Sequence, residues 1–340
     1  MAELSLTGDT PIRVDDAVQA KLHPIWRMVI QRTALGVVTM IIVSIVVFAA
    51  TQLLPGNAAY AILGREATPA QLHNLERQLG LNSPALSQYW HWLSNLVRGR
   101  LGQSLVARVS VSSLIGPRIL NSATLVLTAG IIGTVTGVGL GLVAAVRRDK
   151  LIDHFLSVIT LGLTALPEFV IAIFLIFLLS TNTSHLLPAV SPIPPGEPPW
   201  QQPSMLVLPT LTLVIVIVPY IFRMMRAVTI EALESDYVEM AGLKGLRRSA
   251  VLMRHALPNA IAPTIQAIGL SFLYLAGGIV VVEVVFNYPG VGLALYDAVL
   301  DKDIPTIQAI VMLLAAFYVF MNIATDVIAL IASPRRRFPR

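Results

Sequence analysis

The sequence predicts an all-α polytopic membrane protein with six transmembrane helices and both termini in the cytoplasm. Three observations support this: the composition, six long apolar stretches, and basic residues gathered on alternate connections. Of the 340 residues, 55% are hydrophobic and only 13% are charged, whereas soluble domains carry about 25% charged residues. A chain so poor in charge cannot cover its surface with polar groups, so lipid must form part of its solvent.

Six apolar stretches are long enough to cross a bilayer as helices, which takes about 20 residues. The second is long enough to tilt, and the fourth is short. Charges are rare: the third stretch holds Glu168, the sixth holds Asp326, and Glu283 follows the fifth. The expected spans are residues 33–54, 119–146, 155–180, 205–222, 261–282 and 307–332.

Basic residues set the orientation, because the cytoplasmic flanks of transmembrane helices retain Lys and Arg. With the N-terminus inside, most of the 24 lysines and arginines fall in cytoplasmic segments. The short external loops, 181–204 and 287–305, hold none and one (Lys302), and the remainder lie in the long external segment 55–118. The stretch 33–54 follows a polar segment and leads into no small-residue cleavage site, so we expect a retained anchor rather than a signal peptide.

The spans also define the expected domain organisation. The external segment contains two amphipathic helices, one opened by a capping box at Thr68 and Gln71 and one beginning at Ser83. These helices could cover the outer mouth of the membrane domain or lie in the membrane interface, and we expect packing. The apolar face of the first helix is Leu72, Leu75 and Leu79, and Gly80 is its expected C-cap; the apolar face of the second is Leu86, Trp90, Leu93 and Val97.

The expected parts of the chain are a cytoplasmic extension (1–32), the anchor (33–54), the external segment (55–118), a membrane domain (119–332) with a cytoplasmic loop (226–258), and a basic tail (333–340).

The cytoplasmic loop 226–258 is patterned rather than flexible. Good helix formers with early acids predict a helix over 227–240, and a second helix is expected over 246–257. Gly242 and Gly245 mark a tight break between them, and Pro258 follows where a helix has to stop or bend. The loop therefore predicts a helix–turn–helix that lies against the membrane and presents a compact polar surface to the cytosol.

This loop resembles the "EAA" loop of bacterial ABC importer permeases, which reads E-A-A-x(3)-G-x(9)-I-x-L-P. Five positions of that pattern are in register, whereas Met240 and His255 depart from it. Further segments resemble the B-type permease of the dipeptide, oligopeptide and nickel importer family, and the resemblance covers residues 27–335. The matching loop positions are Glu239, Ala241, Gly245, Leu257 and Pro258, and the further segments are residues 54–57, 79–81, 100–105, 236–238, 254–260, 283–286 and 288–292.

The resemblance implies the fold of a type I ABC importer transmembrane domain in a bacterial plasma (inner) membrane. It implies a permease for di- or oligopeptides, with same-family importers of nickel, glutathione or short sugars left open. The implied partners are a second, C-type permease, two ABC ATPase subunits and an extracytoplasmic solute-binding protein, with no nucleic acid. It assigns ATPase coupling to Glu239, Ala241, Gly245, Arg247, Arg248, His255, Leu257 and Pro258. Arg247 and Arg248 are equally consistent with a simpler role, in which basic residues only set the orientation of the chain in the membrane.

Motifs of covalent or nucleotide chemistry are absent from the sequence. A P-loop needs a glycine directly before its lysine, and none of the lysines has one. There is also no H-E-x-x-H zinc motif and no G-x-S-x-G nucleophile turn. We expect a non-catalytic translocation subunit without cofactor or metal, and ATP and Mg bound by partner ATPases. A secondary transporter, the main rival, would favour several mid-membrane charges or an inverted repeat.

Ionisable residues within membrane spans suggest function by default. Glu168 is expected either to line the translocation pathway, where it meets a charged part of the solute, or to be an internal hydrogen-bonded partner. For Glu283 and Asp326 we expect structural pairing, with an arginine as a candidate partner. Separately, Gly133, Gly137 and Gly141 form a stripe at i, i+4 and i+8 that favours close helix packing.

Overall fold

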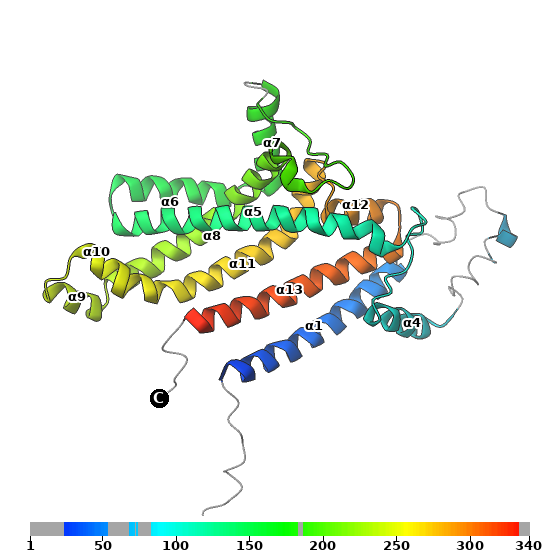
Figure 1. Cartoon of the computed structure of the whole chain (residues 1–340), viewed down its shortest axis with the longest axis horizontal. Helices are drawn as coiled ribbons and strands as arrows, with labels where there is room; N and C mark the ends of the chain where they lie inside the picture. Colours follow the sequence, from blue (N-terminus) through cyan, green and yellow to red (C-terminus); the bar gives the residue numbers. More distant parts are fainter. Residues whose placement is uncertain (1–23, 54–67, 72, 74–82, 183–185, 333–340) are drawn as a thin grey trace, which may run out of the picture.

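Long helices running side by side form the body of the protein (Figure 1). The computed structural model describes residues 24–53, 68–71, 73, 83–182 and 186–332, and within these ranges no β-strand is formed. Five of the helices contain segments long and apolar enough to cross a membrane, and a bent helix pair supplies a sixth span if its two halves count as one. These five are α1 (Pro24–Leu53), α5 (Val111–Val146), α8 (Pro203–Leu233), α11 (Leu257–Val285) and α13 (Ile304–Ala332).

The third predicted span, 155–180, is not one straight helix. It consists of α6 (Leu151–Thr164) and α7 (Glu168–Ile176), which are bent by 104° and followed by a π-helical turn, η2 (Phe177–Asn182). The break lies at Pro167, because proline lacks an amide hydrogen and disfavours a helical conformation of Leu166 before it. Glu168 is therefore the first residue of α7 rather than a mid-span residue.

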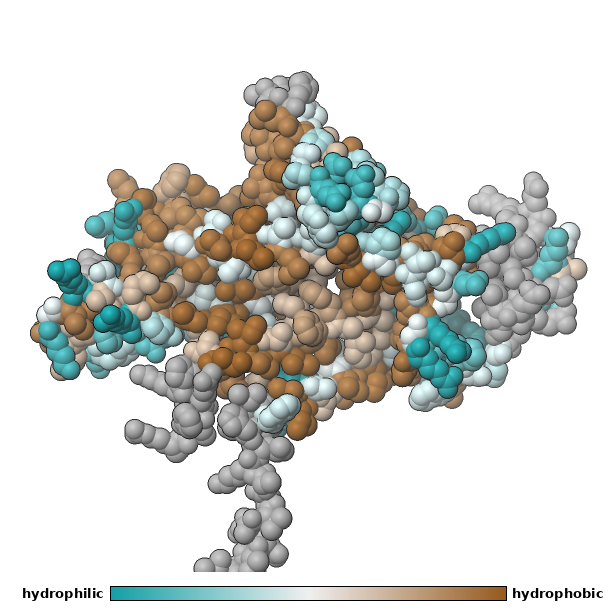
Figure 2. All heavy atoms as spheres, viewed as in Figure 1, coloured by the Kyte–Doolittle hydropathy of each residue, from teal (hydrophilic) through white to brown (hydrophobic). Residues whose placement is uncertain are grey.

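The fourth predicted span, 205–222, is also wrong in length. Helix α8 has 31 residues and continues past Arg223 to Leu233, although Pro209 and Pro219 lie within it. Hydropathy falls at Arg223 and Arg226, but the backbone remains helical because the helix still packs against α5, α6 and α11. Hydrophobic side chains cover the middle of the bundle and hydrophilic ones gather towards its ends (Figure 2).

The glycine stripe of α5 packs directly against α8, as predicted. Its three glycines meet three side chains of α8 in matching order: Gly133 meets Ile217, Gly137 meets Ile221 and Gly141 meets Met225. A Cβ added at Gly137 would lie only 2.8 Å from the Ile221 Cβ, which is closer than side chains tolerate. Glycine therefore lets the two backbones approach, and Ile217 and Ile221 are buried in the central core as a result.

Glu283 closes the end of the bundle opposite the cytoplasmic loop. It is 0% exposed and accepts hydrogen bonds from Ser122 Oγ (2.6 Å), Gly292 N (2.6 Å) and Leu293 N (3.0 Å). It thus caps the N-terminus of α12 (Val291–Leu300), where free amides and the helix dipole favour a carboxylate. The expected structural pairing of Glu283 is confirmed, with a hydroxyl and two amides rather than an arginine as its partners. For Asp326 the arginine partner is confirmed, because Arg32 Nε lies 2.7 Å from Asp326 Oδ2.

Asn121 of α5 fixes the connection from α11 to α12. Its Nδ2 donates to Pro289 O (2.8 Å), and Tyr288 OH donates to Asn121 O (2.9 Å). Tyr288 and Phe286 are fully buried. The segment 283–292, singled out in the sequence, is therefore a capped and enclosed joint between two helices.

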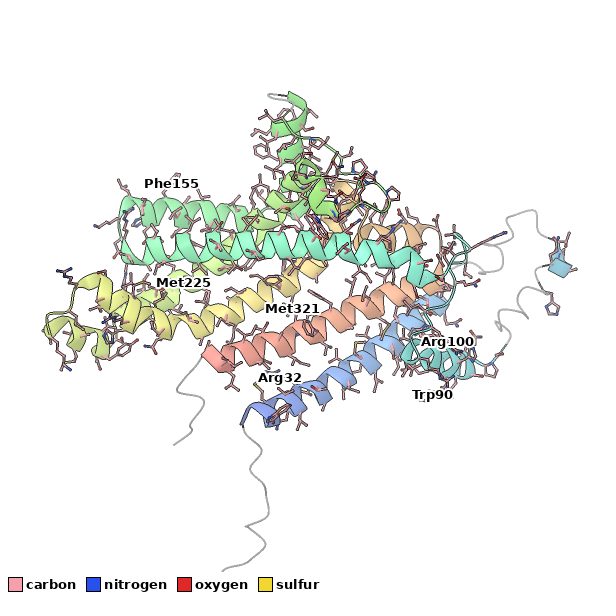
Figure 3. All side chains as sticks on the ribbon, viewed as in Figure 1. Arg32, Trp90, Arg100, Phe155, Met225 and Met321 are labelled. Carbon is pink, nitrogen blue, oxygen red and sulfur yellow. The ribbon has the colours of Figure 1, made fainter. Side chains whose placement is uncertain are left out.

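The external segment packs on α1 with a different face than predicted. The capping box is confirmed, since Thr68 N donates to Gln71 Oε1 (3.0 Å) and Gln71 N to Thr68 Oγ1 (3.4 Å). In α4 (Ala85–Val97), Tyr89 and Trp92 contact the ring of Phe48, with centroids 5.4 and 5.8 Å away. Leu86, Trp90 (labelled in Figure 3) and Val97 instead point outward and are exposed. Residues 72, 75, 79 and 80 of the first amphipathic helix lie outside the described part of the chain.

Candidate functional site: the cytoplasmic loop and the membrane charges

The loop after α8 lies at one end of the bundle (Figure 1). The predicted helix 227–240 is two helices: α8 ends at Leu233, and after Glu234 and Ser235 a separate helix, α9 (Asp236–Leu243), begins. Ser235 has an extended backbone and accepts from Val238 N (2.9 Å) through its carbonyl, so it separates the two helices. The return limb consists of α10 (Arg248–Val251) and the π-helical turn η4 (Leu252–Ala256), which leads into α11.

The turn between the two limbs depends on Gly245. Its φ is +77°, a region that residues with a side chain rarely adopt. Gly245 N donates to Gly242 O (2.9 Å) and Leu246 N to Ala241 O (3.4 Å), the pair of bonds that defines a Schellman C-cap. A Cβ at Gly245 would meet nothing within 4 Å. The glycine is therefore needed for its backbone angle and not to avoid a collision of a side chain.

Small apolar side chains fill the inside of this helix–turn–helix. Ala241 is buried against the return limb and is not available to a partner. It belongs to a cluster with Ala232, Val238, Val251 and Ala256. The two limbs are thus packed on each other and on the end of α8 as one compact unit.

The outer face of the loop combines apolar and charged groups. Met240, Leu243 and Leu246 are 55%, 75% and 43% exposed, which is high for side chains of this kind. Glu239, Lys244, Gly245 and Arg247 are exposed around them. We call these seven residues the loop tip: Glu239, Met240, Leu243, Lys244, Gly245, Leu246 and Arg247.

The other predicted coupling residues lie at the base of the loop. His255 and Leu257 are half-buried, and Pro258 is exposed. Asn259 Nδ2 ties this base together by donating to His255 O (2.8 Å) and to Tyr237 OH (3.0 Å). Arg248 begins α10, and its side chain lies outside the described part of the chain.

Pro258 neither stops nor visibly breaks the helix, contrary to expectation. It is the second residue of α11, directly after the π-helical turn η4, where the regular α-helical hydrogen-bond pattern is already interrupted. The wider π-helical turn just before it, η4, keeps the chain helical from Ser249 to Val285. The base of the loop is therefore continuous with α11.

Comparison with known proteins identifies the type of protein that carries this loop. Residues 137–338 match the family model described as "Binding-protein-dependent transport system inner membrane component", and residues 25–113 match the model of its N-terminal part. The chain belongs to this family. It is a multi-pass inner-membrane permease subunit of an ABC importer, of the dipeptide and oligopeptide type.

Individual relatives and a solved structure agree with the family. The permease is 34% identical over 311 residues to the "Probable peptide ABC transporter permease protein y4tP" of Sinorhizobium fredii, covering 91% of this chain and 99% of that one. It is 34% identical over 310 residues to the glutathione transport system permease protein GsiC of Escherichia coli K12, covering 91% and 98%. The inward-facing MetNI methionine ABC transporter has the same fold, with a TM-score of 0.55 and 16% identity over 65% of the permease and 96% of that chain. The predicted type I importer fold is thereby confirmed.

Two ion pairs that sequence reasoning missed brace the base of the loop in the permease. Arg148, in the turn between α5 and α6, pairs with Glu234 at the end of α8. Arg226 of α8 forms two bonds to Asp153 of α6, Nε to Oδ1 at 2.6 Å and Nη2 to Oδ2 at 2.7 Å. From the sequence, Arg148 and Arg226 are interpreted only as residues that set the membrane orientation, which leaves their acidic partners unidentified. The signal was an acid, Asp153, in the first turn of a mostly apolar helix.

Glu168 lies on a different surface, where α7 begins beside α11. It is half-buried and lies close to the Tyr274 hydroxyl. A Cβ on Gly278 would lie 3.0 Å from Glu168 Oε1, so that glycine leaves room for the carboxylate. The structure therefore does not bring Glu168 together with the loop tip. Glu168 and the loop tip are two separate candidate sites.

Proposed function

We propose that the permease imports short peptides and is driven through its loop tip by separate ATPase subunits. The observation that carries the coupling role is the exposed Met240, Leu243 and Leu246 beside charged Glu239, Lys244 and Arg247. Apolar anchors within a polar rim are the usual composition of a protein–protein contact. The turn at Gly245 holds this surface at the end of the bundle.

The peptide assignment is supported by the relatives. One is named for peptide transport and the other for glutathione, which is itself a tripeptide. Both match the permease over nearly its whole length and theirs, so the likeness includes the membrane domain through which the solute passes. A peptide solute accounts for both names.

We further propose that the complex contains a second, C-type permease, two ATPases and an extracytoplasmic solute-binding protein. ATP and Mg would be bound by the ATPases, since the permease sequence contains no P-loop. The family description, which names binding-protein-dependent transport, supports the external component. The likeness to an ABC importer of known structure supports the second permease and the two ATPases.

In this proposal the permease performs no covalent chemistry and biases an equilibrium between two conformations. Closure of the ATPases on ATP draws the loop tips of the two permeases together. The packed limbs act as one body, and the Arg226–Asp153 bonds together with the helix through Pro258 pass the movement to α6, α8 and α11. The pathway then opens outward to accept the solute, and hydrolysis restores the inward-facing form.

The test is a pull-down of the tagged permease from its native membrane in mild detergent, read by mass spectrometry. Leu243→Asp places a charge on the loop tip, and Leu300→Asp makes the same change at a similarly exposed leucine (64%) at the end of α12. We expect wild type and Leu300→Asp to recover two ATPases and a second permease, and Leu243→Asp to lose the ATPases only. Retention of the ATPases by Leu243→Asp, or wild type purifying alone, would overturn the proposal.

A further inference from the structure

A line of polar and aromatic side chains crosses one exposed face of the membrane bundle. Tyr274 of α11 and Tyr220 of α8 are 43% and 40% exposed, and their ring centroids are 5.8 Å apart. Arg223, one turn beyond Tyr220, has its Cζ 5.3 Å from the centre of that ring. On the other side, Tyr274 lies close to Glu168. We call Glu168, Tyr274, Tyr220 and Arg223, in this spatial order, the polar track.

The other exposed faces of the bundle differ in character. On α5, α13 and α1 most of the exposed side chains are large hydrocarbons, which suit contact with lipid tails, and the main polar exceptions are Tyr318 and the Arg32–Asp326 pair. An acid and an arginine exposed to hydrocarbon would be costly, so such residues in membrane helices normally face a protein interior or water. The hydrocarbon faces are represented by Ile131, Ile132 and Val135 on α5, Phe320 and Ile328 on α13, and Ile41 and Ile45 on α1.

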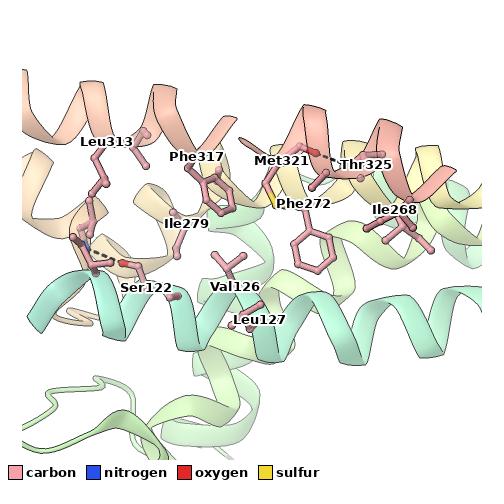
Figure 4. A pocket seen from close by; sticks show the side chains of 18 of the residues that line it. Ser122, Val126, Leu127, Ile268, Phe272, Ile279, Leu313, Phe317, Met321 and Thr325 are labelled. Atoms are coloured by element: carbon pink, nitrogen blue, oxygen red, sulfur yellow. Dashed lines mark hydrogen bonds between the residues drawn. The ribbon is translucent and has the colours of Figure 1, made fainter. Parts of the chain in front are cut away.

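An apolar cavity in the described part of the permease is a weaker candidate for a solute route than this face. It has a volume of about 640 Å³ and lies between α5, α11 and α13 (Figure 4). Hydrocarbon lines it, including Phe272 and Phe317. The hydroxyl of Ser122 is bonded to Glu283 and that of Thr325 to Met321 O, so neither is free to bind a hydrophilic solute.

We propose that the polar track lines the aqueous solute pathway and that it is built for a zwitterionic solute. The Glu168 carboxylate at one end can receive an ammonium group, and the Arg223 guanidinium at the other can receive a carboxylate in a bidentate contact. The two tyrosines between them offer flat rings and hydroxyls to the intervening amides and side chains. A short peptide has one ammonium and one carboxylate at opposite ends. This inference rests on the proposed import of short peptides and names the residues that meet them.

The chain contains no cysteine, which makes a direct test possible. In native membranes, single variants Tyr274→Cys and Tyr220→Cys would be treated with water-soluble methanethiosulfonates, one cationic and one anionic. The matched controls are Val135→Cys (69% exposed) and Phe320→Cys (64% exposed) on the hydrocarbon faces. Since only a hydrated thiol ionises and reacts, we expect the two track cysteines to react at least about tenfold faster than the controls.

The charge of the reagent tests the polarity of the track. A cysteine at 274, beside Glu168, should react about threefold faster with the cationic reagent, and one at 220, beside Arg223, about threefold faster with the anionic reagent. Adding Glu168→Gln to Tyr274→Cys should abolish the first preference. Absence of these preferences would overturn the assignment of two oppositely charged ends.

Equal rates at track and control positions would overturn the inference as a whole, because lipid or a helix of the second permease would then cover the track. The pull-down separates this outcome from a failure of the proposed function. If the ATPases are recovered with Tyr274→Cys and Tyr220→Cys but these cysteines do not react, only the pathway assignment fails. If wild type recovers no ATPases, the importer proposal itself fails.

Discussion

Glu283 and Glu168 are two glutamates of the membrane region that the fold treats in opposite ways. Glu283 is fully enclosed, and Ser122 and two amides of α12 satisfy its oxygens. Glu168 is half-buried, lies close to Tyr274, and is at the edge of an exposed face. Both look alike in a hydropathy profile. The difference indicates two kinds of acid within a membrane domain. An acid is structural when hydrogen-bond donors of the fold satisfy both of its carboxylate oxygens. It is available to a ligand when part of its hydrogen-bonding capacity is left unused.

The largest expected effect comes from removing the enclosed acid. Glu283→Ala leaves three donors without an acceptor in a dry site and should lower the free energy of unfolding by about 3 kcal/mol or more. Thermal unfolding of the purified permease in detergent measures it. Glu283→Gln, which keeps an acceptor oxygen, should lose clearly less. An unchanged unfolding temperature for Glu283→Ala would contradict the structural role of this acid.

A second effect compares an enclosed glycine with an open one on the same helix. Gly137→Leu forces a side chain into the α5–α8 contact and should destabilise the permease by about 1–3 kcal/mol. Gly139→Leu is the control, because Gly139 is exposed and a Cβ there meets nothing within 4 Å. The same thermal unfolding assay applies. Similar losses for both variants would show that the close approach of α5 and α8 is not what requires glycine.

A smaller effect is expected in the cytoplasmic loop. Gly245→Ala must hold a left-handed backbone and should cost about 1 kcal/mol, whereas Gly242→Ala, within α9, should be neutral or slightly stabilising. Thermal unfolding gives the stability, and recovery of ATPases in the pull-down reports the shape of the loop. If Gly242→Ala were the more harmful of the two, the turn would not depend on the backbone angle of residue 245.

The smallest effect on stability is predicted for the open acid. Glu168→Gln should change the free energy of unfolding by no more than about 0.5 kcal/mol, because the glutamine keeps an acceptor for Tyr274. Uptake of labelled trialanine into native membrane vesicles should nevertheless fall by about tenfold, the loss of one ionic contact. A stability loss as large as that of Glu283→Ala would erase the distinction between the two acids.

Local chemistry explains what the sequence could predict. The helices, the glycine stripe, the capping box at Thr68 and the turn at Gly245 each depend on residues close together in the chain or on a repeating spacing. The partner of Glu283 could not be found this way, because Ser122 lies 161 residues before it. A kink at Pro167 could be expected from proline itself, but its size of 104° could not, because the apolar run continues on both sides. In α4, amphipathicity identified a helix but not which of its faces, Trp90 or Tyr89 and Trp92, meets α1.

The C-cap at Gly245 has a consequence for how force passes through the permease. Its two backbone bonds and the packed alanines beneath hold the loop in one shape before any ATPase arrives. A preorganised surface loses little conformational entropy when it docks, so more of the contact energy remains for affinity. If the loop tip binds the ATPase as proposed, a stiff loop would transmit a displacement of its tip to α11 with little loss. The length of that displacement would then be set by the ATPase and not by flexibility of the permease.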